Sequence, residues 1–155
     1  MLHHPQTSYI IVKAGLLVAL PLPCVVETMR PQPLSGLVGM PAFICGLARI
    51  RGASIPVVDL PLLLTGVADI HTERFITIRT NDWQIALAVE SVIDIREISP
   101  ATLDALPPLL GTTPAKYVEA VGALDDGLLL LLRTANIIPP ELWEALRSPL
   151  AGDEE

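Results

Sequence analysis

The sequence predicts an all-β protein, built as a small barrel or a sandwich, and three observations lead to that class. Short strand-like segments recur along the chain with turn residues between them. The connection Asp125-Asp126-Gly127 between two aliphatic runs is the strongest hairpin signal in the chain. Hydrophobic residues make up 51% of the 155 residues and charged residues 17%, a composition that can build a core and argues against disorder.

The predicted strands form pairs that share a turn. Ala14-Gly15 separates the first pair, Arg51-Gly52 forms a hairpin corner in the second, and Asn81-Asp82 connects the third. Pro56 lies inside an apolar strand, where it removes a backbone donor, so an edge or a bulge is expected there. The expected strands are Tyr9–Val12, Leu16–Leu20, Phe43–Ile50, Ile55–Val58, Arg74–Arg79, Trp83–Val89, Val118–Leu124 and Leu128–Leu132.

Three short helices are predicted from their capping residues. Pro23–Met29 can form two turns, with a proline near the start, where its missing N–H matters least. Ala101–Leu106 follows Ser99-Pro100, a capping serine and a proline at the first helical position. Glu141–Arg147 should form a C-terminal helix, because an acid near its start and an arginine at its end match the helix dipole.

The chain is expected to form a single domain over residues 7–147. No shift in composition divides it, and no sequence repeat recurs at a fixed period. A division into two β halves near residues 65–72 stays open. The polar ends, residues 1–6 and 148–155, are expected to be flexible tails.

Composition and charge exclude two classes of partner. The longest apolar run, Ala14–Val26, contains Pro21 and Pro23 and is shorter than the roughly 20 residues that a spanning helix needs. No small-x-small cleavage site follows this run, so we expect a soluble protein rather than an inserted or secreted one. The net charge of −7 and the scattered positions of the ten lysines and arginines argue against nucleic-acid binding.

The residue types that carry chemistry do not cluster in this sequence. Cys24 and Cys45 lie in apolar surroundings without a CxxC spacing, so we expect buried free thiols in a reducing cytoplasm, while a disulfide stays open. His3, His4 and His71 lack the spacing of metal ligands, although a metal pair at His3-His4 stays open. No serine nucleophile elbow and no phosphate-binding loop occurs. We therefore predict no catalytic, cofactor-binding or metal site.

Three charged residues have apolar neighbours in the sequence. Glu27 and Arg51 would each be costly to bury unpaired, and a partly buried ion pair between them would satisfy both and cross-link distant parts of the chain. Asp59 follows an apolar strand, a place where catalytic acids occur. The favoured interpretation is that it accepts backbone N–H bonds and shapes the following turn.

The stretch Gly46–Leu60, GLARIRGASIPVVDL, resembles the signature of the CheW-like family, the coupling proteins of bacterial chemotaxis. That family typically reads G, two residues, N-L/I-R-G, three residues, then P-V/I-V-D-L. Arg49 stands where the family has asparagine. Further blocks that are similar to the family are Ala19–Leu22, Val25–Arg30, Ala86–Asp94 and Val121–Leu132. The likeness runs from about Ser8 to Ile138.

The resemblance implies both a fold and a function. The fold would be two small five-stranded SH3-like barrels around a common core, with short helices and a C-terminal helix. The function would be that of a non-catalytic cytoplasmic adaptor, without cofactors. It would couple the cytoplasmic tips of chemoreceptors to the regulatory domain of a CheA-type histidine kinase and be recruited to membrane receptor complexes. An alternative is a scaffold of the same fold in another system, such as surface motility, with divergent partners.

The resemblance also assigns roles to residues. Glu27 and Arg51 would form an ion pair that links the two barrels. The positions that bear on receptor coupling in the family correspond to Val25, Glu27, Gly46, Arg51 and Ile95.

Arg49 and the exposed apolar strips complete the predicted contact surface. Arg49 places a second cation two residues from Arg51, on the same face of a strand, where it could compete for Glu27 or pair with an acid on a partner. An adaptor makes its contacts through small apolar patches. The segments that could form such patches, or pack in the core instead, are Val25-Val26, Leu37–Pro41 and Leu109-Leu110.

Overall fold

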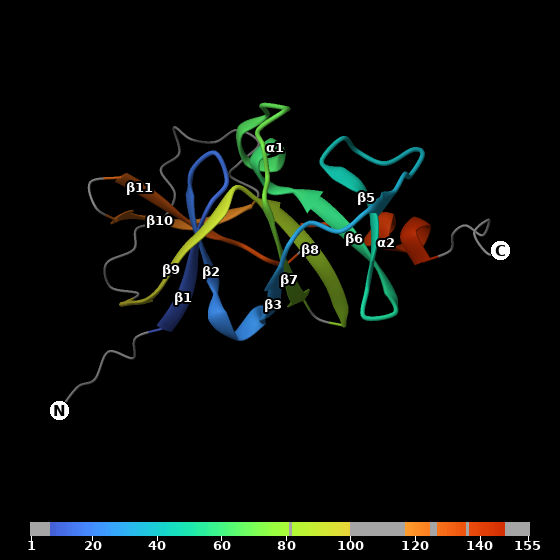
Figure 1. Cartoon of the computed structure of the whole chain (residues 1–155). Coiled ribbons are helices and arrows are strands. Elements are labelled where there is room, and N and C mark those ends of the chain that lie inside the picture. Colours follow the sequence, from blue (N-terminus) through green and yellow to red (C-terminus); the bar gives the residue numbers. More distant parts are fainter. Residues whose placement is uncertain (1–6, 81, 100–116, 125–126, 136, 148–155) are drawn as a thin grey trace.

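Two β-sheets and three short helical elements make up the protein, whose computed structural model describes residues 7–80, 82–99, 117–124, 127–135 and 137–147 (Figure 1). The five-stranded sheet, in the order β10-β11-β2-β1-β9, comprises β1 (Thr7–Lys13), β2 (Leu17–Pro21), β9 (Ser91–Ile98), β10 (Val118–Leu124) and β11 (Gly127–Leu132). The six-stranded sheet, in the order β3-β7-β8-β6-β5-β4, comprises β3 (Val25–Met29), β4 (Leu34–Ser35), β5 (Ile44–Ile50), β6 (Ala53–Asp59), β7 (Arg74–Thr80) and β8 (Trp83–Val89). The helical elements are η1 (Leu22–Cys24), α1 (Leu60–Thr65) and α2 (Pro140–Arg147).

The all-β prediction is confirmed, and so are the eight predicted strands. Each predicted pair forms an antiparallel hairpin, including β10 and β11, in which Leu124 pairs with Gly127 across the turn. The predicted C-terminal helix is present as α2. One sheet has the expected five strands, and the other has a sixth because the two-residue strand β4 adds to β5 at its edge. The predicted helix Ala101–Leu106 lies outside the described residues.

Strands β1 and β11 of the five-stranded sheet are buried on both faces over most of their length. Along β1, Tyr9 and Ile11 pack against Leu129 and Leu131 of β11, whereas the intervening Ile10 joins a cluster that contains residues of both sheets. Strands that are covered on both faces read as unbroken apolar runs, because neither set of alternating side chains meets water. The aliphatic runs of β1 and β11 follow from this burial.

The six-stranded sheet repeats this arrangement. Ile55 and Val57 of β6 pack against Ala86 and Ala88 of β8 inside the sheet's own cluster. The neighbouring Leu87 is fully buried in the larger cluster, which lies between the two sheets. The expected common core is therefore present, with one smaller cluster in each sheet.

The division of the chain into halves near residues 65–72 is wrong. β6, which precedes this stretch, and β7 and β8, which follow it, belong to the same sheet. The five-stranded sheet instead joins both ends of the described chain, since β11 pairs in parallel with β2 at Leu130 and Val18. The division fails because hydrogen bonding between strands distant in sequence, rather than chain order, decides sheet membership.

The helix predicted over Pro23–Met29 is also wrong. One 3-10 turn, η1, is followed by strand β3, which pairs with β7 from Val25 to Met29. Val25, Val26 and Thr28 are β-branched, and such residues favour a strand when a neighbouring strand is available. The proline starts a single turn, and tertiary pairing determines the rest.

Helix α1 was not predicted, although its caps are visible in the sequence. Asp59 is the N-cap, and its Oδ1 accepts a hydrogen bond from the backbone N–H of Leu62 at 3.0 Å. Gly66 ends the helix in the left-handed conformation, with its N–H donated to the carbonyl of Leu62. The interpretation of Asp59 as a residue that accepts backbone N–H bonds is confirmed.

Pro56 lies where the sheet is open on one side. It pairs with Leu47 of β5, whereas the pairing of β6 with β8 begins one residue later, at Val57. The facing strand β5 carries a bulge between Ile44 and Gly46. A proline is tolerated here because its missing donor is not needed toward β8, as predicted.

Candidate functional site

Glu27 is presented by a bulge in the edge strand β3. The register between β3 and β7 shifts between Val25 and Glu27, so Val26 is the extra residue and is 43% exposed. The buried hydroxyl of Thr77 on β7 donates to the carbonyl oxygen of Glu27 at 3.4 Å. Together these contacts fix the backbone from which the Glu27 carboxylate projects.

Arg51 is presented by the tight turn between β5 and β6. Arg51 and Gly52 both have positive φ, at 51° and 82°, as a two-residue hairpin turn of the primed type requires. Arginine rarely adopts this conformation, whereas glycine adopts it readily. The turn projects the guanidinium away from the hairpin and toward β3.

Glu27 and Arg51 form a bidentate ion pair. Arg51 Nε lies 2.7 Å from Glu27 Oε2, and Arg51 Nη2 lies 2.8 Å from Glu27 Oε1. The side chain of Glu27 is 24% exposed and that of Arg51 is 78% exposed. The glutamate is therefore largely covered by protein, whereas the arginine is open to solvent. The hydrogen bonds from Arg51 lower the pKa of Glu27, and those same bonds raise the pKa of Arg51.

The position of this pair corrects the implied link between two barrels. β3 and the β5–β6 turn belong to the same six-stranded sheet, where β7 and β8 lie between β3 and β6. Their side chains can meet because the sheet curls until β3 approaches the far hairpin. The pair therefore cross-links distant parts of the chain within one sheet.

Arg49 lines a surface hollow beside this pair. The hollow, of about 230 Å³, is lined by Glu27, Met29, Gln32, Arg49, Ile50 and Arg51, and we call it the arginine hollow. Arg49 is exposed on β5, whereas Arg51 belongs to the turn, so the two cations do not share a strand face as predicted. Among the described residues, close contacts between a basic side chain and a carboxylate occur at Arg51–Glu27, His71–Glu73 and Arg96–Asp94, and Arg49 takes part in none of them.

Gly46 is buried, and the close approach of a neighbouring strand explains why it is glycine. A Cβ atom at this position would collide with the backbone carbonyl oxygen of Ser35 on β4. β4 pairs with β5 from Ser35 to Leu47, directly beside Gly46. Glycine at this position therefore lets β4 approach β5, while its role in coupling stays a prediction.

Val25 lies at a second hollow, next to η1. This hollow, of about 530 Å³, is lined by Pro23, Cys24, Val25, Val26 and Arg79, and we call it the β3 hollow. A neighbouring hollow of about 430 Å³ shares Pro23 and extends to Thr7 and Ser8 at the start of β1. Arg79 was not predicted as a site residue; its alternation with buried Ile78 on β7 is the signal that marks it as outward-facing.

Ile95 lies on the other sheet, at the edge strand β9. It pairs with buried Ile10 of β1 and is 57% exposed, so it presents an apolar side chain at the surface. Ile93, which was not predicted, is 51% exposed at a bulge in the same strand. Asp94 lies between these two isoleucines and forms an ion pair with Arg96, whose Nε is 2.9 Å from Asp94 Oδ2. Alternating isoleucines and charges on an edge strand are the signal for this surface.

The remaining predicted strips differ in exposure. Val38, within Leu37–Pro41, is 97% exposed, whereas Leu37 and Met40 pack partly against the common core. Leu109-Leu110 lies outside the described residues. Leu37–Pro41 therefore anchors a loop with one exposed apolar side chain at its tip.

Cys24 and Cys45 are free thiols, as predicted, but each is half-buried rather than buried. Burial raises the pKa of both, and for Cys45 burial and the nearby Asp59 charge raise the pKa to about 11. Both thiols are therefore protonated and poorly nucleophilic near neutral pH. In the part of the chain that the structure describes, no group of three His, Cys, Asp or Glu residues could hold a metal ion.

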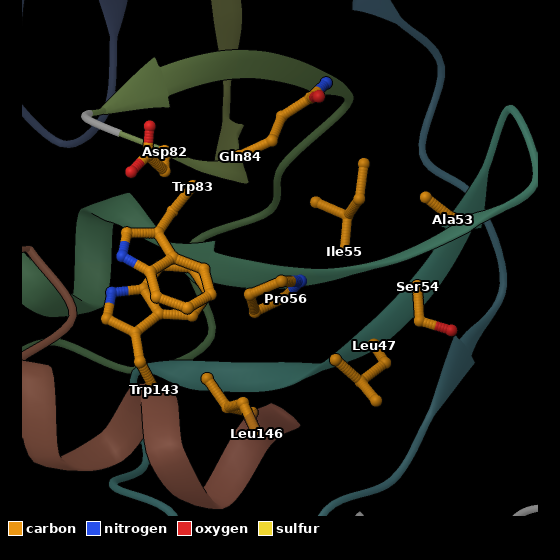
Figure 2. Close-up of a pocket in the computed structure, with 10 residues that line it drawn as sticks. All are labelled: Leu47, Ala53, Ser54, Ile55, Pro56, Asp82, Trp83, Gln84, Trp143 and Leu146. Atoms are coloured by element: carbon orange, nitrogen blue, oxygen red, sulfur yellow. The ribbon is translucent and has the colours of Figure 1, made fainter. Parts of the chain in front are cut away.

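A small pocket lies where β6 and β8 diverge (Figure 2). Trp83 of β8 and Trp143 of α2 stack inside it, with ring centroids 4.4 Å apart and planes 12° apart. Its volume of about 210 Å³ is below the roughly 300–1,000 Å³ of most ligand sites. The pocket is better explained as the place where α2 packs against the strands, because Leu146 of α2 also lines it.

Comparisons with known proteins agree with this architecture. The family model of the CheW-like domain matches residues 8–141. The chemotaxis proteins CheW of Klebsiella aerogenes and Rhizobium meliloti are 23% identical over 124 residues and 25% identical over 115 residues. The first match covers 75% of each chain, and the second covers 73% of this chain and 74% of the relative. The protein FrzA of Myxococcus xanthus is 32% identical over 145 residues, covering 85% of this chain and 89% of FrzA.

A solved structure supports the fold independently. The crystal structure of the scaffolding protein TtCheW from Thermoanaerobacter tengcongensis superposes with a TM-score of 0.74 at 22% identity, over 84% of this chain and 91% of that one. Among the described residues, no helix is long and apolar enough to span a membrane. The match over residues 8–141 establishes that the chain belongs to the CheW-like family.

Proposed function

We propose that this chain is a non-catalytic adaptor that couples chemoreceptor tips to the regulatory domain of a CheA-type histidine kinase. The observation that carries the proposal is the exposed apolar surface on the edge strands β3 and β9. Val26 is 43% exposed on one sheet, and Ile93 and Ile95 are 51% and 57% exposed on the other. The adaptor would work in the cytoplasm and be recruited there to receptor complexes.

The form of this surface suits a protein partner. The β3 hollow and its neighbour are two depressions that share Pro23; one extends to Val26 at the edge of the six-stranded sheet and the other to Thr7 and Ser8 at the start of β1. Small apolar patches framed by charges are typical of contacts that form and release, and an amphipathic helix can bury its apolar face in such a depression. A receptor tip that presents helices fits this description. Arg79 lines the β3 hollow, and the Asp94–Arg96 pair lies on β9 beside Ile93 and Ile95.

Binding measurements with matched variants test the proposal. Ile95→Asp should weaken binding of the receptor tip by about tenfold or more, because a charge enters an apolar contact. Leu128→Asp is the control, since Leu128 is 53% exposed on β11 of the same sheet. Calorimetry should show wild-type binding to both the receptor tip and the kinase regulatory domain encoded in the same genome. Failure of the wild type to bind either partner would overturn the proposal.

A scaffold in another output system is the second candidate. The observation that favours it is the 32% identity to FrzA over 145 residues, together with Arg49 in place of the family's asparagine. Deleting the gene and scoring swimming chemotaxis separately from movement on surfaces would discriminate the two. Loss of surface movement with normal swimming would favour the second candidate.

A further inference from the structure

We propose that the arginine hollow binds a glutamate or aspartate side chain of the receptor tip, with Arg49 as the principal cation. The inference rests on the proposed function, because it assumes that the partner contacts the six-stranded sheet beside β3. It goes further in naming the chemistry that the partner must present.

Arg51 already contacts both carboxylate oxygens of Glu27, and Arg49 forms no ion pair with Glu27. Arg51 contacts Oε2 through Nε and Oε1 through Nη2, at 2.7 and 2.8 Å. A bidentate pair of this kind holds the carboxylate in the plane of one guanidinium. Of the two alternatives raised by the sequence, competition for Glu27 is therefore disfavoured. The Arg49 charge has no carboxylate partner among the described residues.

Arg49 shares the hollow with apolar side chains. Met29 and Ile50 line the hollow next to it, and Ile50 is 5% exposed. A partner that covers this apolar floor would exclude water from the ion pair and so strengthen it. Arg51 Nη1 is not used in the pair with Glu27 and offers a further donor.

The net charge of the arginine hollow favours a carboxylate over a phosphate group. Arg49 and Arg51 bring two positive charges to the hollow and Glu27 brings one negative charge, which leaves one positive charge uncompensated. A singly charged carboxylate neutralises this excess. A dianionic phosphate would overcompensate it and meet the fixed charge of Glu27 at short range. A side chain with an aliphatic stem also fits a floor made of Met29 and Ile50.

Receptor-tip binding to three proteins tests the inference. Arg49→Gln removes the charge and keeps much of the side-chain length, while Lys13→Gln removes the same charge from an exposed site on β1 of the other sheet. By calorimetry we expect Arg49→Gln to weaken binding about tenfold and to flatten its salt dependence, with Lys13→Gln within twofold of wild type. If wild type binds and the two variants bind equally well, this inference is overturned while the proposed function stands.

A measurement without the receptor keeps the inference testable if the proposed function fails. ¹⁵N-labelled full-length protein is titrated with a capped tetraglutamate peptide while the arginine Nε–Hε resonances are followed. We expect saturable shifts at Arg49, smaller shifts at Arg51, and none at exposed Arg133. An unmoved Arg49 resonance, or shifts of equal size at Arg133, would overturn the carboxylate site.

Discussion

Two arginine–carboxylate pairs occupy the two sheets, and they differ in what they join. Arg51 and Glu27 are 24 residues apart, use two hydrogen bonds, and connect the β5–β6 turn to β3. Arg96 and Asp94 are two residues apart on the edge strand β9 and share one hydrogen bond of 2.9 Å. The first pair requires the curled sheet, whereas the second needs a single extended strand. A pair between distant strands reports on tertiary structure, and a pair within a strand mainly keeps the edge charged.

The largest effect is expected from a change in the core between the two sheets that carry these pairs. Leu87→Ala deletes a side chain that is 0% exposed in the core between the sheets. It should lower the free energy of unfolding by about 2–5 kcal/mol. Denaturant unfolding should remain a single transition for tryptophan fluorescence and for far-UV circular dichroism. Two separated transitions would show that the sheets unfold independently.

The next largest effect should be confined to the region of the first pair. Gly46→Ala places a Cβ atom against the carbonyl of Ser35, so β4 must move away from β5. We expect a loss of about 1–3 kcal/mol in the free energy of unfolding, by the same denaturant method. Gly36→Ala is the control, because its Cβ would meet no atom within 4 Å. Equal losses in both variants would contradict the role assigned to the Ser35 carbonyl.

A smaller effect should follow from breaking the long-range pair itself. Arg51→Gln should lower Tm by no more than about 4 °C, because Arg51 is 78% exposed. The pKa of Glu27 is lowered in the folded protein, so the stabilisation is present above the unfolded value of about 4.3 and is lost as pH falls through the folded pKa. Thermal scans at neutral and at strongly acidic pH should show the difference between variant and wild type at neutral pH alone. A difference independent of pH would mean that the substitution acts through the turn.

The smallest effect is expected for the local pair. The hydrogen bond from Arg96 lowers the pKa of Asp94, followed in size by the bond from the backbone N–H of Ile95. Asp94→Asn keeps an oxygen that can accept from this N–H, so Tm should change by about 1 °C or less. A drop as large as that of Arg51→Gln, measured in the same scans, would remove the distinction between the two pairs.

Local signals in the sequence accounted for much of the fold. The hairpin at Arg51-Gly52, the Asn81-Asp82 connection between β7 and β8, and the acid near the start of the C-terminal helix each specify their element within a few residues. Sheet membership and the strand conformation of Val25–Met29 could not be derived in this way, because both depend on pairing with strands far along the chain. The same limit applies to the site. The apolar contexts of Glu27 and Arg51 suggested a pair, while the curl that brings them together exists only in the folded sheet.

The parallel pairing of β2 with β11 has a consequence for how the chain folds as it is made. Val18 emerges from the ribosome long before its partner Leu130, so the hairpin of β1 and β2 is synthesised well before β11, its neighbour in the finished sheet. The strands β3 to β8 can pair among themselves in the meantime, because all their partners in the six-stranded sheet lie between Val25 and Val89. Long-range pairing of this kind slows folding and leaves apolar segments exposed, which makes them prone to aggregation. The early strands are therefore where a nascent chain would need protection by a chaperone.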